Sequence, residues 1–414
     1  MWTYLDHQID LANEGIKILR EHAIVYLAME ERTGKTGTAI AICEDCSISS
    51  VLVITKLDAI EGWNEHLTNL LHLCSYTVIN YHSAHKAKGK FDLIILDEAH
   101  NYISGYPKHS SIWKNIQKLT KDKPLIYISA TPHAQGAQLL YGQFALSSWS
   151  PWSKFKDFYA WFKHYAARDK NGSFKMKYIG PDREAIDYTA VRHDDIFEEV
   201  KHLFITKTRA ELGFEHEPED HLHYIELSDN IKEVYNTILK KKAIEFTSSK
   251  NGKDYKLVCD TPAKLRAALH MIEGGGLKLQ NAQGKEEYLE LGNEEKAEYI
   301  LKTWGDTEDV VIMYNYIVEE IKLKRMFKHA RVLQAQKYAE GVDLSKHKHL
   351  IIYSQNFSTA KHTQRRARQA NINRNEEIKV HYLLVKKAVS EQCYKAVSKN
   401  KTNFVDNLFE RVEL

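Results

Sequence analysis

Two short motifs have residue types and spacing that suit the hydrolysis of a nucleotide. Residues 33–36 read Thr-Gly-Lys-Thr, and residues 97–100 read Asp-Glu-Ala-His. A Gly-Lys-Thr turn surrounds a triphosphate with backbone N–H groups, while its lysine reaches the β- and γ-phosphates and its threonine hydroxyl reaches Mg²⁺. The first motif is therefore predicted to bind a nucleoside triphosphate and Mg²⁺ through Thr33, Gly34, Lys35 and Thr36.

The second motif supplies two carboxylates. Asp97 is predicted to hold Mg²⁺ through water, together with Thr36, and Glu98 to activate the attacking water. Each motif alone has a simpler explanation, because Gly-Lys-Thr can occur by chance and Asp97 could cap a helix. However, both follow strand-like segments, in the expected order and about sixty residues apart, as a repeated strand–helix unit would place them. The pair therefore indicates hydrolysis of ATP or GTP.

The first motif departs from its usual form at two positions. Met29 stands where G-x-x-x-x-G-K-[ST] has its first glycine, and Arg32 replaces a further glycine that is common in motor proteins. Glycine is favoured where backbone turns tightly around phosphate. These departures keep open the alternative of a degenerate motor that binds nucleotide without turnover.

The composition is that of a soluble globular protein. A chain of 414 residues suits two domains. No apolar stretch has the roughly eighteen residues of a membrane-spanning helix, and no basic segment followed by an apolar one marks a secretory signal at the N-terminus. The odd number of cysteines, five, favours a reducing compartment. We therefore expect a cytoplasmic protein with no membrane contact.

The pattern of cysteines and histidines predicts no metal site other than that for Mg²⁺. Cys43 and Cys46 form one C-x-x-C pair, but no second pair lies at zinc-ligand spacing. The pair falls on the helix expected after Thr36, where ordinary packing is favoured. The 21 histidines contain no H-E-x-x-H arrangement.

The distribution of charge says more than its sum. A formal net charge of +3 neither indicates nor excludes a nucleic-acid partner. Between Lys361 and Lys401 basic residues dominate. Such a face can bind a phosphate backbone, and a solvated helix face is the open alternative.

The elements that must position these motifs alternate between strand and helix. Short apolar or β-rich runs separated by longer amphipathic stretches predict a parallel sheet with crossover helices. Ligands bind at the carboxyl ends of such strands, where the residues 33–36, 97–100 and 129–131 all fall. The predicted strands of this first domain are Ala23–Ala28, Val51–Thr55, Tyr76–Asn80, Leu93–Leu96 and Leu125–Ser129.

The same alternation resumes near the end of the chain and predicts a second α/β domain without its own phosphate loop. Two helices are expected at Asn315–Phe327 and Gln364–Ala370, and the stretch 387–413 should be largely helical. Two such domains favour an ATP cleft between them. The predicted strands are Val310–Tyr314, Val332–Ala335, His349–Tyr353 and Val380–Val385.

We therefore divide the chain into a first domain at 1–150, an aromatic and helical insertion with a connecting segment at 151–285, and a second domain at 286–414. Residues 147–165 are dense in aromatic side chains, for which packing is favoured and a base-stacking platform is the alternative. Polar composition predicts loops or a small insertion at 166–190 and 247–257, and a linker at 281–295.

In this order, the motifs resemble those of superfamily 2 helicases and translocases, motors built from two RecA-like parallel-sheet domains. Tyr4 and Gln8 resemble the glutamine motif, which implies that Gln8 reads the adenine edge. Residues 33–36 match motif I, and the Asp-Glu-Ala-His sequence is a DEAH-type motif II. Ser129-Ala130-Thr131-Pro132 matches motif III, which implies that Ser129 and Thr131 couple hydrolysis to movement on nucleic acid.

The second domain carries counterparts of motifs V and VI. Glu340-Gly341-Val342-Asp343-Leu344 resembles motif V, which implies nucleotide contacts from Gly341 and Asp343. Gln364-Arg365-Arg366-Ala367-Arg368 resembles motif VI, which implies that Gln364 couples motion and that arginines reach the γ-phosphate. Arg368 is the expected principal arginine finger and Arg365 the second. Asn371 stands where the family has a further arginine. Arg374 or Arg365 could take its place, or the motor could be slower.

Shorter fragments resemble the Swi/Snf-like branch of this superfamily and its compact bacteriophage relatives. They are Lys264-Leu265-Arg266, Lys296-Ala297-Glu298 and Ser390-Glu391. The resemblance implies a cytoplasmic motor that uses ATP and Mg²⁺ and moves on or remodels duplex or branched DNA. A phage-encoded form would act in the host cytoplasm, in replication, recombination or repair, where replication or recombination proteins could be partners.

Two alternatives stay open. One is an RNA helicase of the same architecture, and the other is the degenerate module that binds nucleic acid without turnover. The resemblance places nucleic-acid contacts on both domains, on the face away from ATP, with candidates at Lys56, Tyr81, His82, Thr131 and the motif V loop. Tyr81 could instead belong to the core.

Overall fold

The chain folds into two compact units that divide between Gly213 and Phe214. The computed structural model describes residues 2–45, 48–132, 136–180, 183–214, 216–247, 252–335, 344–355, 362, 365–370, 374 and 376–399. The division falls inside the predicted middle segment 151–285, and the boundaries of that segment stay a prediction.

The first unit is built on a six-stranded parallel sheet in the order β3-β2-β4-β5-β1-β8. The predicted parallel sheet is confirmed, and each predicted strand is present within one or two residues of its expected bounds. β8 is an additional strand from the middle segment. The strands are β1 (Ile24–Leu27), β2 (Ser50–Thr55), β3 (Ser75–Asn80), β4 (Leu93–Asp97), β5 (Leu125–Ile128) and β8 (Phe204–Ile205).

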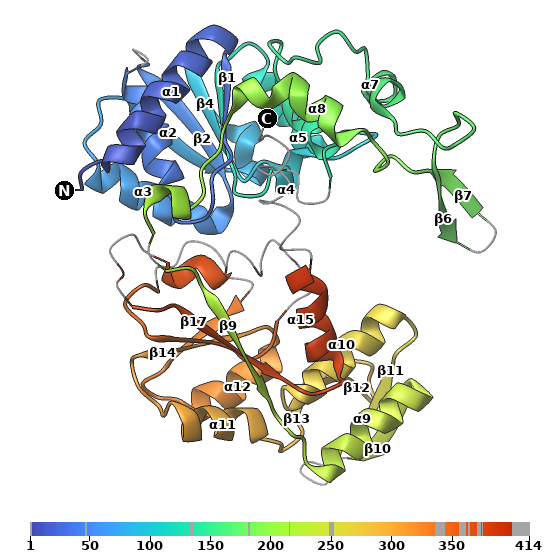
Figure 1. Cartoon of the computed structure of the whole chain (residues 1–414). Coiled ribbons are helices and arrows are strands. Elements are labelled where there is room, and N and C mark those ends of the chain that lie inside the picture. The colour runs from blue at the N-terminus through green and yellow to red at the C-terminus, as the bar shows by residue number, and fades with distance from the viewer. Residues whose placement is uncertain are drawn as a thin grey trace. The chain divides into compact units, whose positions relative to one another are not determined.

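Helices cover both faces of this sheet (Figure 1). Side chains alternate along each strand, so Ile24 and Tyr26 enter one hydrophobic cluster while Val25 and Leu27 enter the other. On the Val25 side lie α1 (Asp6–His22), α2 (Lys35–Asp45) and α3 (Ile60–Asn69). On the Ile24 side lie α4 (His100–Ile103), α5 (Ser111–Thr120), α6 (Leu139–Phe144), α7 (Phe158–Tyr165) and α8 (His193–Val200).

The aromatic segment packs, as expected. Trp152, Phe158, Trp161, Phe162 and Tyr165 are each at most 3% exposed and belong to the Ile24-side core. After α7 the chain forms the hairpin of β6 (Met176–Gly180) and β7 (Arg183–Ile186), which extends away from the sheet in Figure 1. Of the two possibilities predicted for 166–190, loops are wrong for these strands, and a small insertion fits the hairpin.

The second unit is built on a five-stranded parallel sheet in the order β15-β14-β16-β17-β9. The predicted alternation is confirmed in β14 to β17. α11 (Glu295–Thr303) and α12 (Ile317–Met326) share a hydrophobic cluster with this sheet. The strands are β9 (Glu219–Tyr224), β14 (Val310–Tyr314), β15 (Arg331–Gln334), β16 (His349–Ile352) and β17 (Lys379–Leu384).

A four-stranded antiparallel sheet, β10-β11-β12-β13, also belongs to this unit. Its apolar face packs on α9 (Asp229–Lys241) and α10 (Pro262–Glu273). The linker prediction for 281–295 is therefore wrong, and so is the loop prediction where it overlaps β11. The strands are β10 (Ala243–Thr247), β11 (Asp254–Val258), β12 (Gly276–Asn281) and β13 (Glu286–Glu290).

The last described helix is α15 (Val389–Lys399). Residues 387 and 388 are not helical, and the part of the predicted helix at 400–413 lies outside the described residues, as does Cys46. Cys43 is fully buried in α2, as ordinary packing predicts. Within the described ranges, no helix is long and apolar enough to cross a membrane.

Candidate nucleotide site

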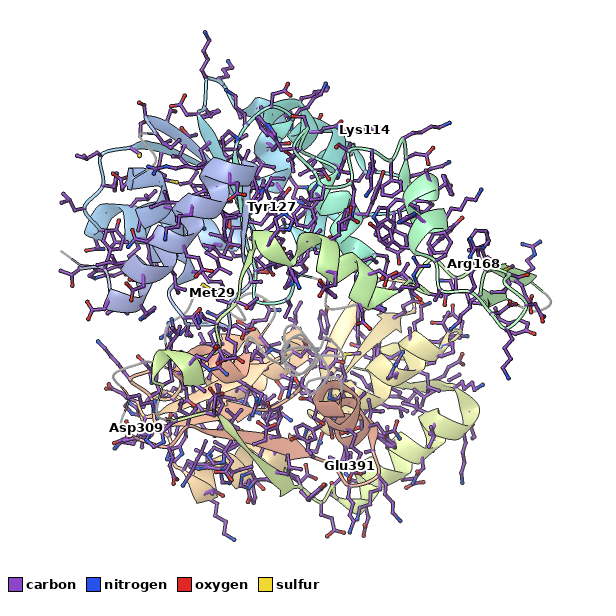
Figure 2. The ribbon with its side chains drawn as sticks, turned by 45° about the horizontal axis from the view of Figure 1, so that its top comes forward. Met29, Lys114, Tyr127, Arg168, Asp309 and Glu391 are labelled. Carbon is purple, nitrogen blue, oxygen red and sulfur yellow. The ribbon has the colours of Figure 1, made fainter. Side chains whose placement is uncertain are left out.

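The loop between β1 and α2 has the backbone of a phosphate-binding turn. Met29, labelled in Figure 2, is fully buried at its start. Arg32 and Gly34 have left-handed backbone, with φ of 70° and 85°. α2 begins at Lys35, so N–H groups at the N-terminus of a helix are available to an anion.

The ammonium group of Lys35 donates hydrogen bonds to carbonyl groups of its own loop. Its Nζ donates hydrogen bonds to the carbonyls of Met29, at 2.9 Å, and Glu30, at 2.6 Å. Burial lowers the pKa of Lys35, and the nearby carboxylates of Glu31, Glu98 and Asp97 act in the opposite direction. The lysine of the first motif thus lies near enough to both carboxylates of the second for their charges to favour its ionised form.

Gln8 of α1 holds the same loop through a hydrogen bond to its backbone. Gln8 Nε2 donates to the Gly34 carbonyl at 2.9 Å, and Gln8 Oε1 accepts from the Leu5 N–H at 2.8 Å. The left-handed backbone at Gly34 favours glycine, and a Cβ atom there would also displace the Gln8 amide. Thr33 is buried and its hydroxyl donates to the Glu30 carbonyl at 2.7 Å. Gln8 therefore orders the loop in this structure, and its contact with adenine stays a prediction.

Asp97 ends β4 and is held by two donors. Its Oδ2 accepts from Thr55 Oγ1 at 2.7 Å and from Trp63 Nε1 at 2.9 Å. Burial first, and then the charge of Glu98, raise the pKa of the Asp97 carboxyl, while the two hydrogen bonds lower it. The carboxylate is oriented by these bonds before any ligand arrives.

Glu98 is linked to the predicted motif III. Ser129 Oγ donates to Glu98 Oε2 at 3.0 Å and lies 3.0 Å from His100 Nδ1. The Thr131 N–H donates to the same Ser129 oxygen at 3.0 Å. Glu98 itself has left-handed backbone, with φ of 51°. Such strain in a non-glycine residue is typical of functional sites.

One candidate nucleic-acid contact is wrong. Tyr81 is 1% exposed, and its hydroxyl donates to the Asp97 carbonyl at 2.9 Å. Its side chain therefore supports the end of β4, as the core alternative allowed. Lys56 and His82 have accessible surface, and their contact with nucleic acid stays a prediction.

In the second unit, the arginines of the predicted motif VI have different surroundings. Arg365 is 2% exposed, and its Nε and one terminal nitrogen have no hydrogen-bond partner in the described part of the chain. Arg366 is paired with Asp220, Nε to Oδ1 at 2.5 Å. Arg368 is half-buried, and its carbonyl accepts from the Leu344 N–H at 3.1 Å, which joins motif VI to the last residue of motif V.

Arg374 has a structural role in this unit. Its guanidinium donates to the carbonyls of Ser345, at 2.8 Å, and His347, at 3.2 Å. This arrangement favours Arg368 over Arg374 as the finger. Four residues that were predicted or discussed for this half of the site lie outside the described residues: Gly341, Asp343, Gln364 and Asn371.

Three residues of the site were not predicted from the sequence. Thr55 ends β2, which is the strand next to β4. The expectation that ligands bind at the carboxyl ends of parallel strands, which identified Asp97, could also have identified Thr55. Trp63 lies in a helix and gave no signal. Arg209 follows the short strand β8 and is paired with Glu30 and Glu31 of the phosphate loop. Only the folded register brings it there.

The residues present fit Mg²⁺ and a nucleoside triphosphate. Thr36, the second residue of α2, offers a hydroxyl and Asp97 a carboxylate, and oxygen ligands of this kind suit Mg²⁺. The start of α2 and the ammonium of Lys35 offer the positive field that phosphates need. The arrangement can therefore bind a triphosphate next to a carboxylate base.

The sequence matches a protein family described as the SNF2-related domain, over residues 63–271. This match covers just over half of the 414 residues. The chain therefore belongs to the SNF2-related family. The predicted Swi/Snf-like branch is thereby confirmed, while the likeness to bacteriophage relatives stays a prediction.

Among solved structures, the chain is similar to the SWI2/SNF2 ATPase core of Sulfolobus solfataricus, which is in complex with double-stranded DNA. The two chains share 14% sequence identity, with 98% of this chain and 92% of that chain covered and a TM-score of 0.43. No curated protein matches the chain. The assignment to the family therefore rests on the sequence match.

Proposed function

We propose that the protein is an ATP-dependent DNA translocase that couples ATP hydrolysis to movement on, or remodelling of, duplex or branched DNA. The observation that carries this proposal is the meeting of Lys35, Asp97 and Glu98 at the carboxyl edge of one parallel sheet. Membership of the SNF2-related family supports the use of ATP and of a DNA track.

The residues of the first unit would divide the chemistry among them. The loop around Gly34 and the Lys35 ammonium would hold the phosphates, and Lys35 would exchange its two carbonyl partners for phosphate oxygens. Glu98 would accept the proton of the attacking water. Thr36 and Asp97 would hold Mg²⁺, which neutralises charge that develops on the phosphates.

Other residues would couple and complete this chemistry. Ser129 contacts Glu98 and receives the Thr131 N–H, so a shift of that segment would reorient the base. Gln8 would select adenine after release from Gly34. Arg368, with Arg365 second, would supply the positive charge that stabilises phosphoryl transfer, an effect worth roughly 10³-fold or more in related motors. Gln364, Gly341 and Asp343 would take the coupling and nucleotide-contact roles of their motifs.

The finer setting is also a proposal. The compact form of the DEAH-type motor favours a phage-encoded enzyme of replication, recombination or repair in the host cytoplasm. A partner among replication or recombination proteins would fit that setting. An RNA track is the second candidate, because both groups of superfamily 2 motors share this architecture.

The test is steady-state ATP hydrolysis without nucleic acid and with single-stranded DNA, duplex DNA, branched DNA or RNA. We expect stimulation by duplex or branched DNA that falls as salt rises, because phosphate contacts release counterions. Stimulation by RNA alone would favour the RNA helicase. ATP binding without hydrolysis under every condition would favour the degenerate module.

A further inference from the structure

The phosphate loop contains two adjacent carboxylates in the site that is proposed to bind a polyanion. Glu30 and Glu31 lie between Met29 and Arg32, and their side chains are only 20% and 13% exposed. Carboxylates that are partly removed from water interact more strongly with neighbouring charges than exposed ones do. Uncompensated, they would oppose the binding of a triphosphate.

The positive charge of Arg209 compensates the negative charges of Glu30 and Glu31. Its side chain is 6% exposed, with Nε 3.8 Å from Glu30 Oε2 and one terminal nitrogen 3.7 Å from Glu31 Oε2. The same terminal nitrogen donates to the Glu31 carbonyl at 3.4 Å. The Arg209 backbone N–H donates to Glu30 Oε2 at 2.7 Å. Arg209 is thus paired by charge with both glutamates, and its backbone N–H also holds Glu30.

The fold places Arg209 there through strand register. β8 pairs in parallel with β1, with Leu27 opposite Ile205. The pairing continues beyond the strand ends, because the Ala28 N–H donates to the Ile205 carbonyl at 2.9 Å and the Glu30 N–H to the Lys207 carbonyl at 3.0 Å. The segment that follows β8 therefore runs beside the phosphate loop.

The glutamates are connected in turn to Lys35. The Glu30 carbonyl accepts a hydrogen bond from Lys35 Nζ at 2.6 Å. The segment after β8, which holds Glu30 in place, therefore also positions this hydrogen-bond acceptor of Lys35. Glu31 is the carboxylate that most favours the charged form of Lys35, whose pKa burial lowers. Among these four groups, when all are ionised, Lys35 and Arg209 balance Glu30 and Glu31. Loss of Arg209 therefore adds one uncompensated negative charge to a site that also contains Asp97 and Glu98.

We propose that Arg209 is a positioning residue for nucleotide binding, which neutralises Glu30 and Glu31 so that the phosphate loop accepts a triphosphate. This inference rests on the proposed function. It differs from a purely structural role in one respect: the effect of Arg209 should grow with the charge of the nucleotide.

The test is equilibrium binding of AMP, ADP and ATP, with Mg²⁺ present, to the full chain and to Arg209→Met, which keeps side-chain length without charge. We expect ATP affinity to fall roughly tenfold, the scale for one charge at a partly exposed site, with a smaller loss for ADP and the least for AMP. Arg209→Lys should retain most of the affinity. Arg192→Met serves as the control, because Arg192 forms an exposed pair with Asp195 in the same unit.

Rescue separates charge from folding. Glu31→Gln added to Arg209→Met should restore most of the ATP affinity, and Glu31→Gln alone should strengthen ATP binding relative to AMP. If Arg209→Met does not fold, this single Glu31 variant still tests the proposal.

Equal losses for all three nucleotides without rescue, or no loss at all, would overturn the role of Arg209 while leaving the proposed function intact. Absence of ATP binding by the unaltered chain would instead contradict the proposed function and this inference with it.

Discussion

Trp63 Nε1 donates a 2.9 Å hydrogen bond to Oδ2 of Asp97, and this bond favours the ionised form of a carboxyl whose pKa burial raises. An ionised Asp97 is needed to hold Mg²⁺, so activity should fall in acid as Asp97 takes up a proton. Trp63→Phe removes the donor and keeps most of the ring. The pKa of the Asp97 carboxyl in this variant should therefore rise. The acid limb of the kcat/KM profile should move to higher pH by up to about one unit, which corresponds to the free energy of one hydrogen bond to a charged group.

Trp113→Phe is the matched control for this prediction. Trp113 is also buried and its Nε1 donates to the Gly142 carbonyl at 2.7 Å, a bond that does not involve Asp97. Its loss should leave the pH profile in place. An unchanged profile in Trp63→Phe would show that the tryptophan does not tune the carboxyl.

The strained backbone at Arg32 predicts a difference between two substitutions. Arg32 has φ of 70°, a conformation that costs residues with a Cβ atom about 1 kcal/mol or more. Arg32→Gly and Arg32→Ala both remove the side-chain interactions, and only alanine keeps the Cβ atom. In urea unfolding, the glycine variant should be more stable than the alanine variant by about 1 kcal/mol. Equal stabilities would argue against strain at this position.

Close packing around Gly275, which lies between α10 and β12, predicts a large cost for Gly275→Ala. A Cβ atom there would lie 1.7 Å from Lys322 Nζ and 2.7 Å from the Asn293 carbonyl oxygen. Gly292→Ala is the control, because Gly292 also has left-handed backbone but no atom within 4 Å of the added Cβ. The free energy of unfolding should fall by about 1 kcal/mol in the control and by a further 1–3 kcal/mol, roughly, in Gly275→Ala. Similar losses in both variants would contradict the packing.

A chain of histidines predicts that acid weakens the second unit. His381 is 6% exposed, with Nδ1 3.0 Å from His223 Nε2 and Nε2 3.4 Å from His349 Nδ1. Burial, and then the charges of these neighbours, lower the pKa of His381 to about 3. The unfolded chain therefore binds a proton that the folded one does not, and stability is lost as pH falls below the ordinary value of 6.5.

The expected loss between pH 7.5 and 5.5 is about 1.4 kcal/mol for each histidine of this kind. His381→Gln should reduce the difference between the urea midpoints at these two pH values. His82→Gln, which changes an exposed side chain of the first unit, serves as the control. If His381→Gln shows the same pH dependence as the unaltered chain, His381 does not contribute to the loss of stability in acid.

Most strands of the parallel sheets could be predicted because they are short apolar or β-rich runs. β9, which reads Glu-Asp-His-Leu-His-Tyr, has no such run and was not predicted. The run Val310–Tyr314 gives β14 without error, and all five of its side chains are buried. The first half of the site followed from the same logic, since Asp97 and Ser129 stand at the ends of such runs and Lys35 ends the loop that follows another.

The antiparallel sheet was missed for a physical reason. β13 reads Glu-Glu-Tyr-Leu-Glu. It is placed by its antiparallel pairing with β12, with Leu277 opposite Leu289, and by a core shared with α9 and α10. Trp63 and Arg209 were missed because their roles depend on partners 34 and 179 residues away. No local pattern reports such contacts.

The most direct test of the central claim compares binding with turnover in Glu98→Gln. The variant keeps the side chain's size and a group that can accept from Ser129, but it removes the base. We expect ATP to bind the variant with an affinity close to that of the unaltered chain, while DNA-stimulated hydrolysis falls by roughly 10²-fold or more. Hydrolysis near the original rate would contradict the assignment of Glu98 and the hydrolytic site built around it.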